Sequence, residues 1–377
     1  SRNGHCENWQ RTNVLQTAQD PQVLFLELCI RKLKPGGRLG IVLPEGTFGN
    51  RHEGYIWQWL RTQGSIDALL DCPRTTFQPG TDAKTNVLFF RKFSSTDRSA
   101  MGAGHTVRIA VALHCGHDRR GRTHHSDGRP YRNDFHDIGI QYHSARVTDG
   151  PWKSITSLRP DYLVPRYYAD ERPVTQQELD LVRGAETASL GDLIRHGLLT
   201  LRKGHEVGSD TYGSGDVPFV RTSDISNFEI SSDPTNSVSE EIYETYGKQQ
   251  MLSPGDVLVV ADGRYRIGMS AILTWRNYRC VIQSHLRILG TPRRDLLDPY
   301  ELLFALNLPA VRLRIRDLVF VQSTLGTLGN RILELRIPVL SGRGPWRERV
   351  DTFRRCLQQR DEVLSELQTM TGSEFEI

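Results

Sequence analysis

The chain has 377 residues and a formal net charge of +4, and 38% of its residues are hydrophobic and 24% are charged. This length predicts two or three domains, and the composition is typical of a soluble globular protein. No apolar run approaches the length of a membrane-spanning helix and no signal peptide is visible, so we expect no membrane association and a cytoplasmic location.

The six cysteines are scattered along the chain without a Cys-x-x-Cys pair. Such scattering is typical of reduced thiols in a cytoplasmic protein. The basic residues are mostly arginine, which is the better bidentate partner for phosphate and guanine. A GC-rich genome also favours arginine codons, so the DNA-binding interpretation requires arginines that cluster on one face.

The first third of the chain alternates predicted helices and strands. Residues 1–18 are polar and predict a loop, and Asp20-Pro21 then starts an amphipathic helix that ends at residues 34–37. The elements expected next are a buried strand over 39–43, a loop over 45–54, a helix ending at Gly64, and strands over 65–71, 85–93 and 108–113. This order indicates an α/β arrangement.

Two segments of this part contain sequence motifs of a known family: FLELCIRKLKPGGRLGIVLPEGTF and IDALLDCPRTTFQPGTDAKTNVLFFRK. From about Asp20 to Phe93 the chain resembles the N6-adenine DNA methylases of type I modification subunits. The resemblance implies a partial Rossmann-like methyltransferase sheet and, in the intact enzyme, S-adenosylmethionine as cofactor.

The sequence departs from that family at two motifs. It lacks the Gly-rich acidic turn that holds S-adenosylmethionine and the Asn-Pro-Pro-aromatic loop that holds the flipped adenine. In the family's order both motifs would precede Ser1. We therefore expect the C-terminal part of a longer methylase, with no catalytic or cofactor-binding residues of its own and no activity alone.

The stretch from Ser189 to Arg331 has a different pattern. Short β-branched runs alternate with Gly-Asp, Asp-Gly and Ser-Pro-Gly turns, which predicts a compact, mainly β module. Residues 257–262 are apolar on both faces up to Ala261 and predict a central strand. The turns carry arginine, lysine and small polar residues, which are the side chains that grip phosphates and read base edges.

Several blocks of this stretch occur in a definite order: LGDLI, the Lys203-Gly204 turn, PFVRTSDI, LSPGDVLVV, the loop over 263–268, QSHLRI, and QSTLGTLGNRI before IPV. In this order they resemble the target recognition domain of type I restriction-modification specificity subunits, over most of residues 189–340. The resemblance implies a domain that docks on double-stranded DNA and selects bases with loop side chains.

We expect the DNA contacts to come from the turns of this domain. The candidate residues are Arg202, Lys203, Arg221, Thr222, Ser223, Arg264, Tyr265, Arg266, Gln283, Ser284, Thr324, Asn330 and Arg331. Two arginines flank a tyrosine on the hairpin over 263–268, which favours phosphate contact over core packing. The Arg221 turn is open to both a groove contact and a capped turn. Gln283 is equally open to reading adenine and to buried hydrogen bonding.

No other catalytic or metal chemistry is indicated. Cys115, His117, His124 and His125 gather in an arginine-rich segment, but their spacing is not that of a zinc finger, so a solvated loop is favoured and no metal is predicted. A Gly-x-Ser-x-Gly nucleophile motif is absent from the sequence.

Residues 346–369 contain no glycine or proline and place apolar residues in a 4-3 spacing, which predicts a helix with a narrow apolar seam. Specificity subunits have a spacer helix at this place that pairs with another helix. Packing of the helix on its own domain is about as well supported. Pairing would bring a methylase or restriction subunit or a second copy of the chain as partner.

The predicted organisation is α/β followed by mainly β, and α+β as a whole. Its parts are a methyltransferase piece over 1–141, a connector over 142–175, a target recognition domain over 176–342 and a spacer helix over 343–377. The function expected is sequence-specific DNA binding and, in the intact enzyme, adenine-N6 methylation of DNA in a restriction-modification or related defence system. The alternative is a non-catalytic specificity or assembly module that positions a separate methylase or nuclease.

Overall fold

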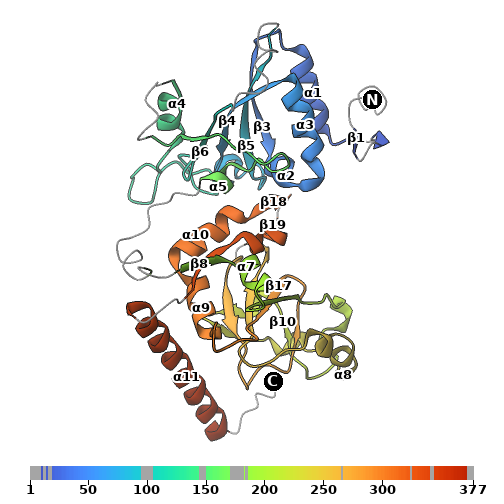
Figure 1. Ribbon diagram of the computed structural model, residues 1–377, viewed down its shortest axis with the longest axis vertical. Helices are drawn as coiled ribbons and strands as arrows, with labels where there is room; N and C mark the ends of the chain where they lie inside the picture. The colour runs from blue at the N-terminus through green and yellow to red at the C-terminus, as the bar shows by residue number, and fades with distance from the viewer. Residues whose placement is uncertain are drawn as a thin grey trace. The chain divides into compact units, whose positions relative to one another are not determined.

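The computed structural model describes residues 10–11, 14–15, 19–94, 105–143, 150–169, 182, 186–264, 266–322, 325–339 and 344–371. The chain forms two compact units. Unit 1 comprises Ser1–Glu171 and Phe320–Gly326, and unit 2 comprises Arg172–Val319 and Thr327–Ile377. Both units contain helices and sheets (Figure 1), so the chain is α+β, as predicted.

Unit 1 is built on a five-stranded sheet with the order β3-β5-β4-β6-β7. β5 pairs antiparallel with β3 and β4, β4 and β6 are parallel, and β6 and β7 are antiparallel. The sheet is therefore mixed, and its relation to a Rossmann-like sheet stays a prediction. The elements are β1 (Gln10–Arg11), β2 (Val14–Leu15), α1 (Pro21–Lys32), β3 (Arg38–Pro44), α2 (Glu45–Gly49), α3 (Gly54–Gln63), β4 (Gly64–Asp71), β5 (Thr85–Lys92), β6 (Val107–Val111), α4 (Phe135–His143), β7 (Lys153–Ile155), α5 (Pro165–Tyr168), β18 (Phe320–Gln322) and the start of β19 (Leu325–Thr327).

The two faces of this sheet are covered by different helices. The apolar stripe of α1 and the buried face of α3, which includes Trp57, pack with Leu69 and Leu88 of the strands in one core cluster. A smaller cluster on the opposite face joins Leu70 with Ile138 of α4 and Trp152. Leu69 and Leu70 are neighbours in β4 and point to opposite faces because strand residues alternate. A bulge between Ile66 and Ala68 shifts the register of β4 against β5. The predicted helices and strands of this part are confirmed.

Four stretches of unit 1 differ from the sequence-based expectation. The loop predicted over 1–18 contains the short paired strands β1 and β2. The loop predicted over 45–54 contains the short helix α2, and the stretch predicted as a connector supplies β7, α5 and the buried residues 162–164 to this unit. The segment 320–326, which the sequence placed in the recognition domain over 176–342, contains β18 and the start of β19 and belongs to unit 1. These short elements follow from tertiary contacts rather than from local periodicity.

Unit 2 is built on a four-stranded antiparallel sheet with the order β15-β13-β17-β9. All four residues of β13 are buried, so the prediction of a central strand is confirmed. The elements are β8 (Glu186–Ser189), α7 (Leu190–Arg195), β9 (Thr200–Lys203), β10 (Phe219–Val220), β11 (Ile225–Ser226), β12 (Glu229–Ile230), α8 (Glu240–Ile242), β13 (Val257–Val260), β14 (Asp262–Gly263), β15 (Ser270–Ile272), β16 (Val281–Ile282), β17 (Leu286–Gly290), α9 (Pro299–Asn307), α10 (Pro309–Leu318), β20 (Arg336–Val339) and α11 (Pro345–Thr371).

The C-terminal helix α11 packs on the rest of unit 2 from Trp346 to Asp361. The buried Trp346 donates from Nε1 to Glu301 Oε1 at 2.9 Å, and the Phe353 ring lies 5.2 Å from Phe228 and 5.4 Å from Phe304 between centroids. Farther along the helix Val363 is 53% exposed. The predicted helix is confirmed, and packing on its own domain, one of the two alternatives, is observed for this part of the helix.

Candidate nucleic-acid interface

The turns that carry the predicted DNA contacts gather at one edge of unit 2. His205, after β9, pairs with Gln283 before β17, and the Gln283 amide donates to Val220 O of β10 at 2.9 Å. Gly204 makes this approach feasible, since a Cβ there would lie 2.1 Å from the carbonyl oxygen of Gln283. The Lys203-Gly204 turn is thus fixed against two other predicted segments.

The loop between β14 and β15 joins the same assembly through Arg266. Its Nη1 donates to Ser223 O at 2.9 Å and to Ile225 O at 2.8 Å. The guanidinium of Arg266 therefore ties two loops together, while Arg264 is exposed in the same loop. Tyr265 and Thr324, which we also predicted as contacts, lie outside the described residues.

Five of the predicted residues form a surface that we call the loop edge. Lys203, Ser223 and Arg264 are exposed, and Gln283 and Ser284 are half-buried. They come from four separate turns, which the backbone contacts above hold together. The loop edge offers two cations and three small polar side chains, which is a combination suited to phosphates and base edges.

Two other predicted arginines are held inside unit 2. Arg202 pairs with the buried Asp256 at 2.8 Å and donates to Gln250 O at 2.6 Å. Arg331 is only 7% exposed, and its Nε donates to Leu318 O at 2.7 Å. Both guanidinium groups stabilise the fold, so they are poorly placed to reach DNA.

The Arg221 turn has the geometry of a capped turn, one of the two alternatives. The Arg221 amide donates to Asp224 Oδ2 at 2.9 Å, and Ser223 Oγ donates to Asp224 Oδ1 at 2.7 Å. The Arg221 guanidinium lies 5.8 Å from the ring centre of Tyr212 and 4.0 Å from Asp233. Thr222 is half-buried in the same turn.

Asn330 lies near the base of the β14 loop. It is exposed at the start of the 3-10 turn Gly329–Glu334. The preceding Leu328 amide donates to Ala261 O at 3.0 Å, which fixes this turn beside the strand end that leads into β14.

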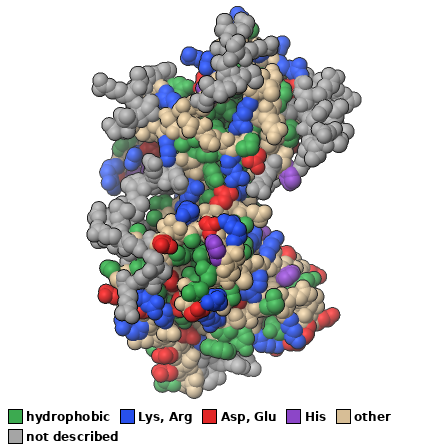
Figure 2. All heavy atoms as spheres, viewed as in Figure 1, with side chains coloured by type: hydrophobic (Ala, Val, Ile, Leu, Met, Phe, Trp, Pro, Cys, Tyr) green, Lys and Arg blue, Asp and Glu red, His purple; other side chains and the backbone are tan. Residues whose placement is uncertain are grey.

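Four charged or titratable residues beside the loop edge were missed by sequence reasoning. Ser284 Oγ donates to Glu206 Oε2 at 2.6 Å. Asp262 accepts from Arg287 Nη2 at 3.2 Å and lies 3.9 Å from His285. Asp262 and His285 stand in segments that the sequence had already marked, the Asp-Gly turn and the QSHLRI block. Figure 2 shows basic and acidic side chains intermixed on the viewed face.

Unit 1 holds a buried cluster of charges. Lys84 Nζ lies 2.5 Å from Asp71 and 3.5 Å from Glu45, and Arg166 pairs with the same two carboxylates. Burial opposes the charge of Arg166, but Glu45 and Asp71 raise its pKa. Glu45 also accepts the Val321 amide at 2.7 Å, which fixes the segment 320–326 in this unit.

The Cys/His-rich segment shows no metal-site geometry. Among the described residues, no group of three or more His, Cys, Asp or Glu side chains is placed to hold a metal ion. Cys115 Sγ instead lies 3.1 Å from Thr75 Oγ1. Burial raises the pKa of the nearby Cys72 thiol to about 11, so this group is a protonated thiol at neutral pH.

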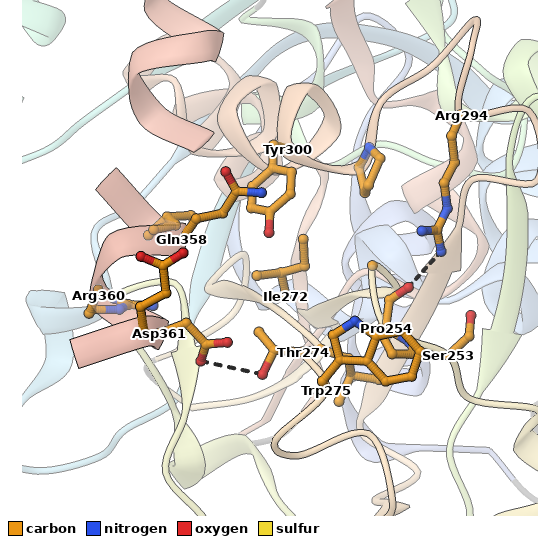
Figure 3. Close-up of a pocket in the computed structure, with 15 residues that line it drawn as sticks. Ser253, Pro254, Ile272, Thr274, Trp275, Arg294, Tyr300, Gln358, Arg360 and Asp361 are labelled. Carbon is orange, nitrogen blue, oxygen red and sulfur yellow. Dashed lines mark hydrogen bonds between the residues drawn. The ribbon is translucent and has the colours of Figure 1, made fainter. Parts of the chain in front are cut away.

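A pocket of about 670 Å³ in unit 2 lies where α11 meets the start of α9 and the loop after β15. Figure 3 shows that its polar residues pair within its walls: Thr274 lies 3.5 Å from Asp361, and Arg294 donates to Pro254 O. Trp275 lines it and is 77% exposed. The lining contains none of the predicted DNA contacts, and we interpret the pocket as part of the packing interface between α11 and the rest of unit 2.

The comparisons with known proteins concern the N-terminal part most directly. Residues 2–104 match the profile of the family described as N-6 DNA Methylase. This segment is methylase-like. The type I restriction enzyme EcoEI methylase subunit of Escherichia coli is 39% identical over 74 residues, which are 19% of this chain and 15% of that subunit. The predicted resemblance of this segment is confirmed, and the chain spans only a small part of the relative it matches.

Solved structures give weaker similarities. The S subunit of a type I restriction-modification system from M. genitalium has 15% identity and a TM-score of 0.34, over 49% of this chain and 42% of that one. The type IIG restriction endonuclease BpuSI has 12% identity and a TM-score of 0.34, over 88% of this chain and 44% of that one. Scores this low do not assign a fold.

In the described part of the chain, helices are too short or too polar to cross a membrane.

Proposed function

We propose that this chain binds double-stranded DNA in a sequence-specific manner and that, within an intact enzyme, it serves adenine-N6 methylation in a restriction-modification or related defence system. The methylase-like segment over residues 2–104 supports the class of reaction. The gathering of cationic and small polar side chains at the loop edge is the observation that carries the DNA-binding role.

Different residues of the loop edge would have different tasks. Lys203 and Arg264 are exposed cations, which suit phosphate oxygens and give orientation without sequence choice. Gln283 and Ser284 carry hydrogen-bonding groups that suit base edges. Glu206 already accepts a hydrogen bond from the Ser284 hydroxyl group, so it orients that side chain.

We further propose the functional parts given by the sequence: a methyltransferase piece over 1–141, a connector over 142–175, a recognition domain over 176–342 and a spacer helix over 343–377. In the structure the connector supplies β7 and α5 to unit 1, and the segment 320–326 also belongs to that unit. In this arrangement the partners are duplex DNA and a methylase or restriction subunit or second copy that binds through the C-terminal helix. The exposed Val363 on the second half of α11 supports such a contact.

S-adenosylmethionine would supply the methyl group in the intact enzyme. Among the described residues of unit 1, the buried side chains Glu45, Asp71, Lys84 and Arg166 pair with one another, so this cluster offers no unpaired charge to the cofactor. We therefore assign no step of methyl transfer to residues of this chain.

The second candidate is a non-catalytic module that positions a separate methylase or nuclease. The two functions share the DNA-binding step and differ in methyl transfer. Incubation of the intact enzyme that contains this chain with tritiated S-adenosylmethionine and bound duplex separates them. Transfer by the intact enzyme without a partner subunit indicates a methylase. Transfer only after addition of a partner subunit indicates a positioning module.

Selection from a random duplex pool tests the shared step. We expect enrichment of a defined sequence, together with binding that weakens steeply as salt concentration rises because phosphate contacts release counterions. Recovery of an unenriched pool, or affinity that does not depend on salt, would reject the proposal.

A further inference from the structure

The segment 114–133 of unit 1 forms an exposed, arginine-rich hairpin that the proposed function does not use. It is the loop between β6 and α4 (Figure 1), and it contains five arginines and four histidines against two aspartates. Every residue over 119–130 is exposed. A segment with so little burial is not held in place by a hydrophobic core.

Backbone pairing gives this hairpin a defined shape. Cys115 bridges Asn133, and His124 bridges Pro130. The Tyr131 amide donates to Thr123 O at 2.9 Å, and the His125 ring lies 3.8 Å from the Tyr131 ring between centroids. The hairpin therefore presents its side chains from an ordered frame, which lowers the conformational entropy lost on binding.

Arg119 and Arg120 are the central residues of its first tight turn. The Gly121 amide closes this turn by donating to Asp118 O at 3.0 Å, and Gly121 has the positive φ of 79° that favours glycine. Asp118 Oδ1 also accepts the amides of Arg120 at 2.8 Å and of Arg122 at 2.9 Å. The two arginine side chains thus lie at the corner of a fixed turn.

The carboxylates of the hairpin are neutralised by other arginines. Arg122 pairs with Asp118 at 2.7 Å, and Arg129 pairs with Asp127 at 2.7 Å. Among the described residues, neither Arg119 nor Arg120 has a carboxylate partner. The uncompensated positive charge of the hairpin is therefore concentrated at the first turn.

We propose that the turn 118–121 is a second DNA contact, which grips backbone phosphates through Arg119 and Arg120 without reading sequence. Guanidinium groups bind phosphate oxygens bidentately, and the ordered turn presents two of them from adjacent residues. This inference rests on the proposed DNA-binding function and adds a contact in the other unit.

Salt titration of the 377-residue chain tests it. The duplexes are one with the selected sequence and one scrambled duplex of equal length. The slope of log affinity against log salt is negative, and each lost phosphate contact reduces its magnitude by about 0.9. We therefore expect the double variant Arg119→Gln/Arg120→Gln to reduce the magnitude of the slope by roughly 2. Affinity for both duplexes should fall by the same factor, and Arg119→Lys/Arg120→Lys should retain most of the slope.

A matched control removes two exposed arginines of α11, Arg349→Gln/Arg355→Gln. An equal effect of this control would overturn the inference, since it would reflect net charge alone. An unchanged slope in the hairpin variant, with sequence preference intact in the parent chain, also rejects the inference and leaves the proposed function standing. Salt-dependent binding that needs the hairpin but shows no preferred sequence supports the inference and rejects the proposed function. Absence of any binding by the parent chain rejects both.

Discussion

At the scale of single residues, the structure separates cations that hold the fold from cations that are available to a ligand. Arg202 and Lys203 are neighbours in β9 and would look equivalent in the sequence. Arg202 turns toward the buried Asp256, whereas Lys203 is exposed. Strand alternation predicts that neighbours face opposite sides, but only the fold reveals which side carries the buried carboxylate.

This difference predicts opposite effects for two adjacent substitutions. Arg202→Gln leaves Asp256 without its cation and removes hydrogen bonds to backbone carbonyls, so it should lower the free energy of unfolding by about 2–3 kcal/mol. Lys203→Gln should leave stability unchanged and weaken DNA binding at low salt. Urea unfolding and gel shifts measure the two effects. Equal loss of stability in both variants would contradict the assignment.

At the scale of elements, regular periodicity gave reliable predictions and short elements did not. The apolar residues of β13, buried on both faces, and the seam of α11 are visible in the sequence because each extends over a full strand or helix. The helix α2 covers only Glu45–Gly49 and includes two glycines, so no local sequence pattern predicts it. The contacts of the candidate site depend on close turn-to-turn approaches such as that at Gly204, which local sequence does not encode.

The packing of α11 can be tested at Phe353. Its ring contacts Phe228 and Phe304, so Phe353→Ala should cost about 2 kcal/mol, less than full burial would give, and should lower amide protection along α11. Arg355→Ala, at an exposed position of the same helix, is the control. Hydrogen exchange measures the protection. Unchanged protection in Phe353→Ala would show that the helix is held by other contacts.

The first turn of the arginine-rich hairpin should respond to acid. Hydrogen bonds from Arg122 and Arg120 hold the pKa of Asp118 at about 2, below its ordinary value of 3.8. Because the pKa is lowered on folding, the stabilisation is complete above pH 3.8 and is lost as pH falls through about 2. An NMR titration of the Asp118 carboxyl group, with Asp118→Asn as control, should show a midpoint near 2. A midpoint near 4 would mean that the turn contacts are absent in solution.

At the scale of the whole molecule, chain order and spatial order differ at one place. The segment 320–326 lies between parts of unit 2 in sequence but belongs to unit 1, where Glu45 accepts the Val321 amide. The two residues are far apart along the chain, and no local pattern links them. The division into a methylase-like part and a β-rich part was visible from motif order, whereas this exchange of a segment was not.

The central claim is that turns of unit 2 choose the DNA sequence. The most direct measurement is the ratio of affinities for the selected and the scrambled duplex, at fixed salt, in the parent chain and in the double variant Gln283→Ala/Ser284→Ala. Each lost base contact costs about 1–3 kcal/mol of discrimination, so the ratio should fall at least roughly tenfold while affinity for the scrambled duplex stays nearly constant. An unchanged ratio, or an equal loss of affinity for both duplexes, would contradict the claim.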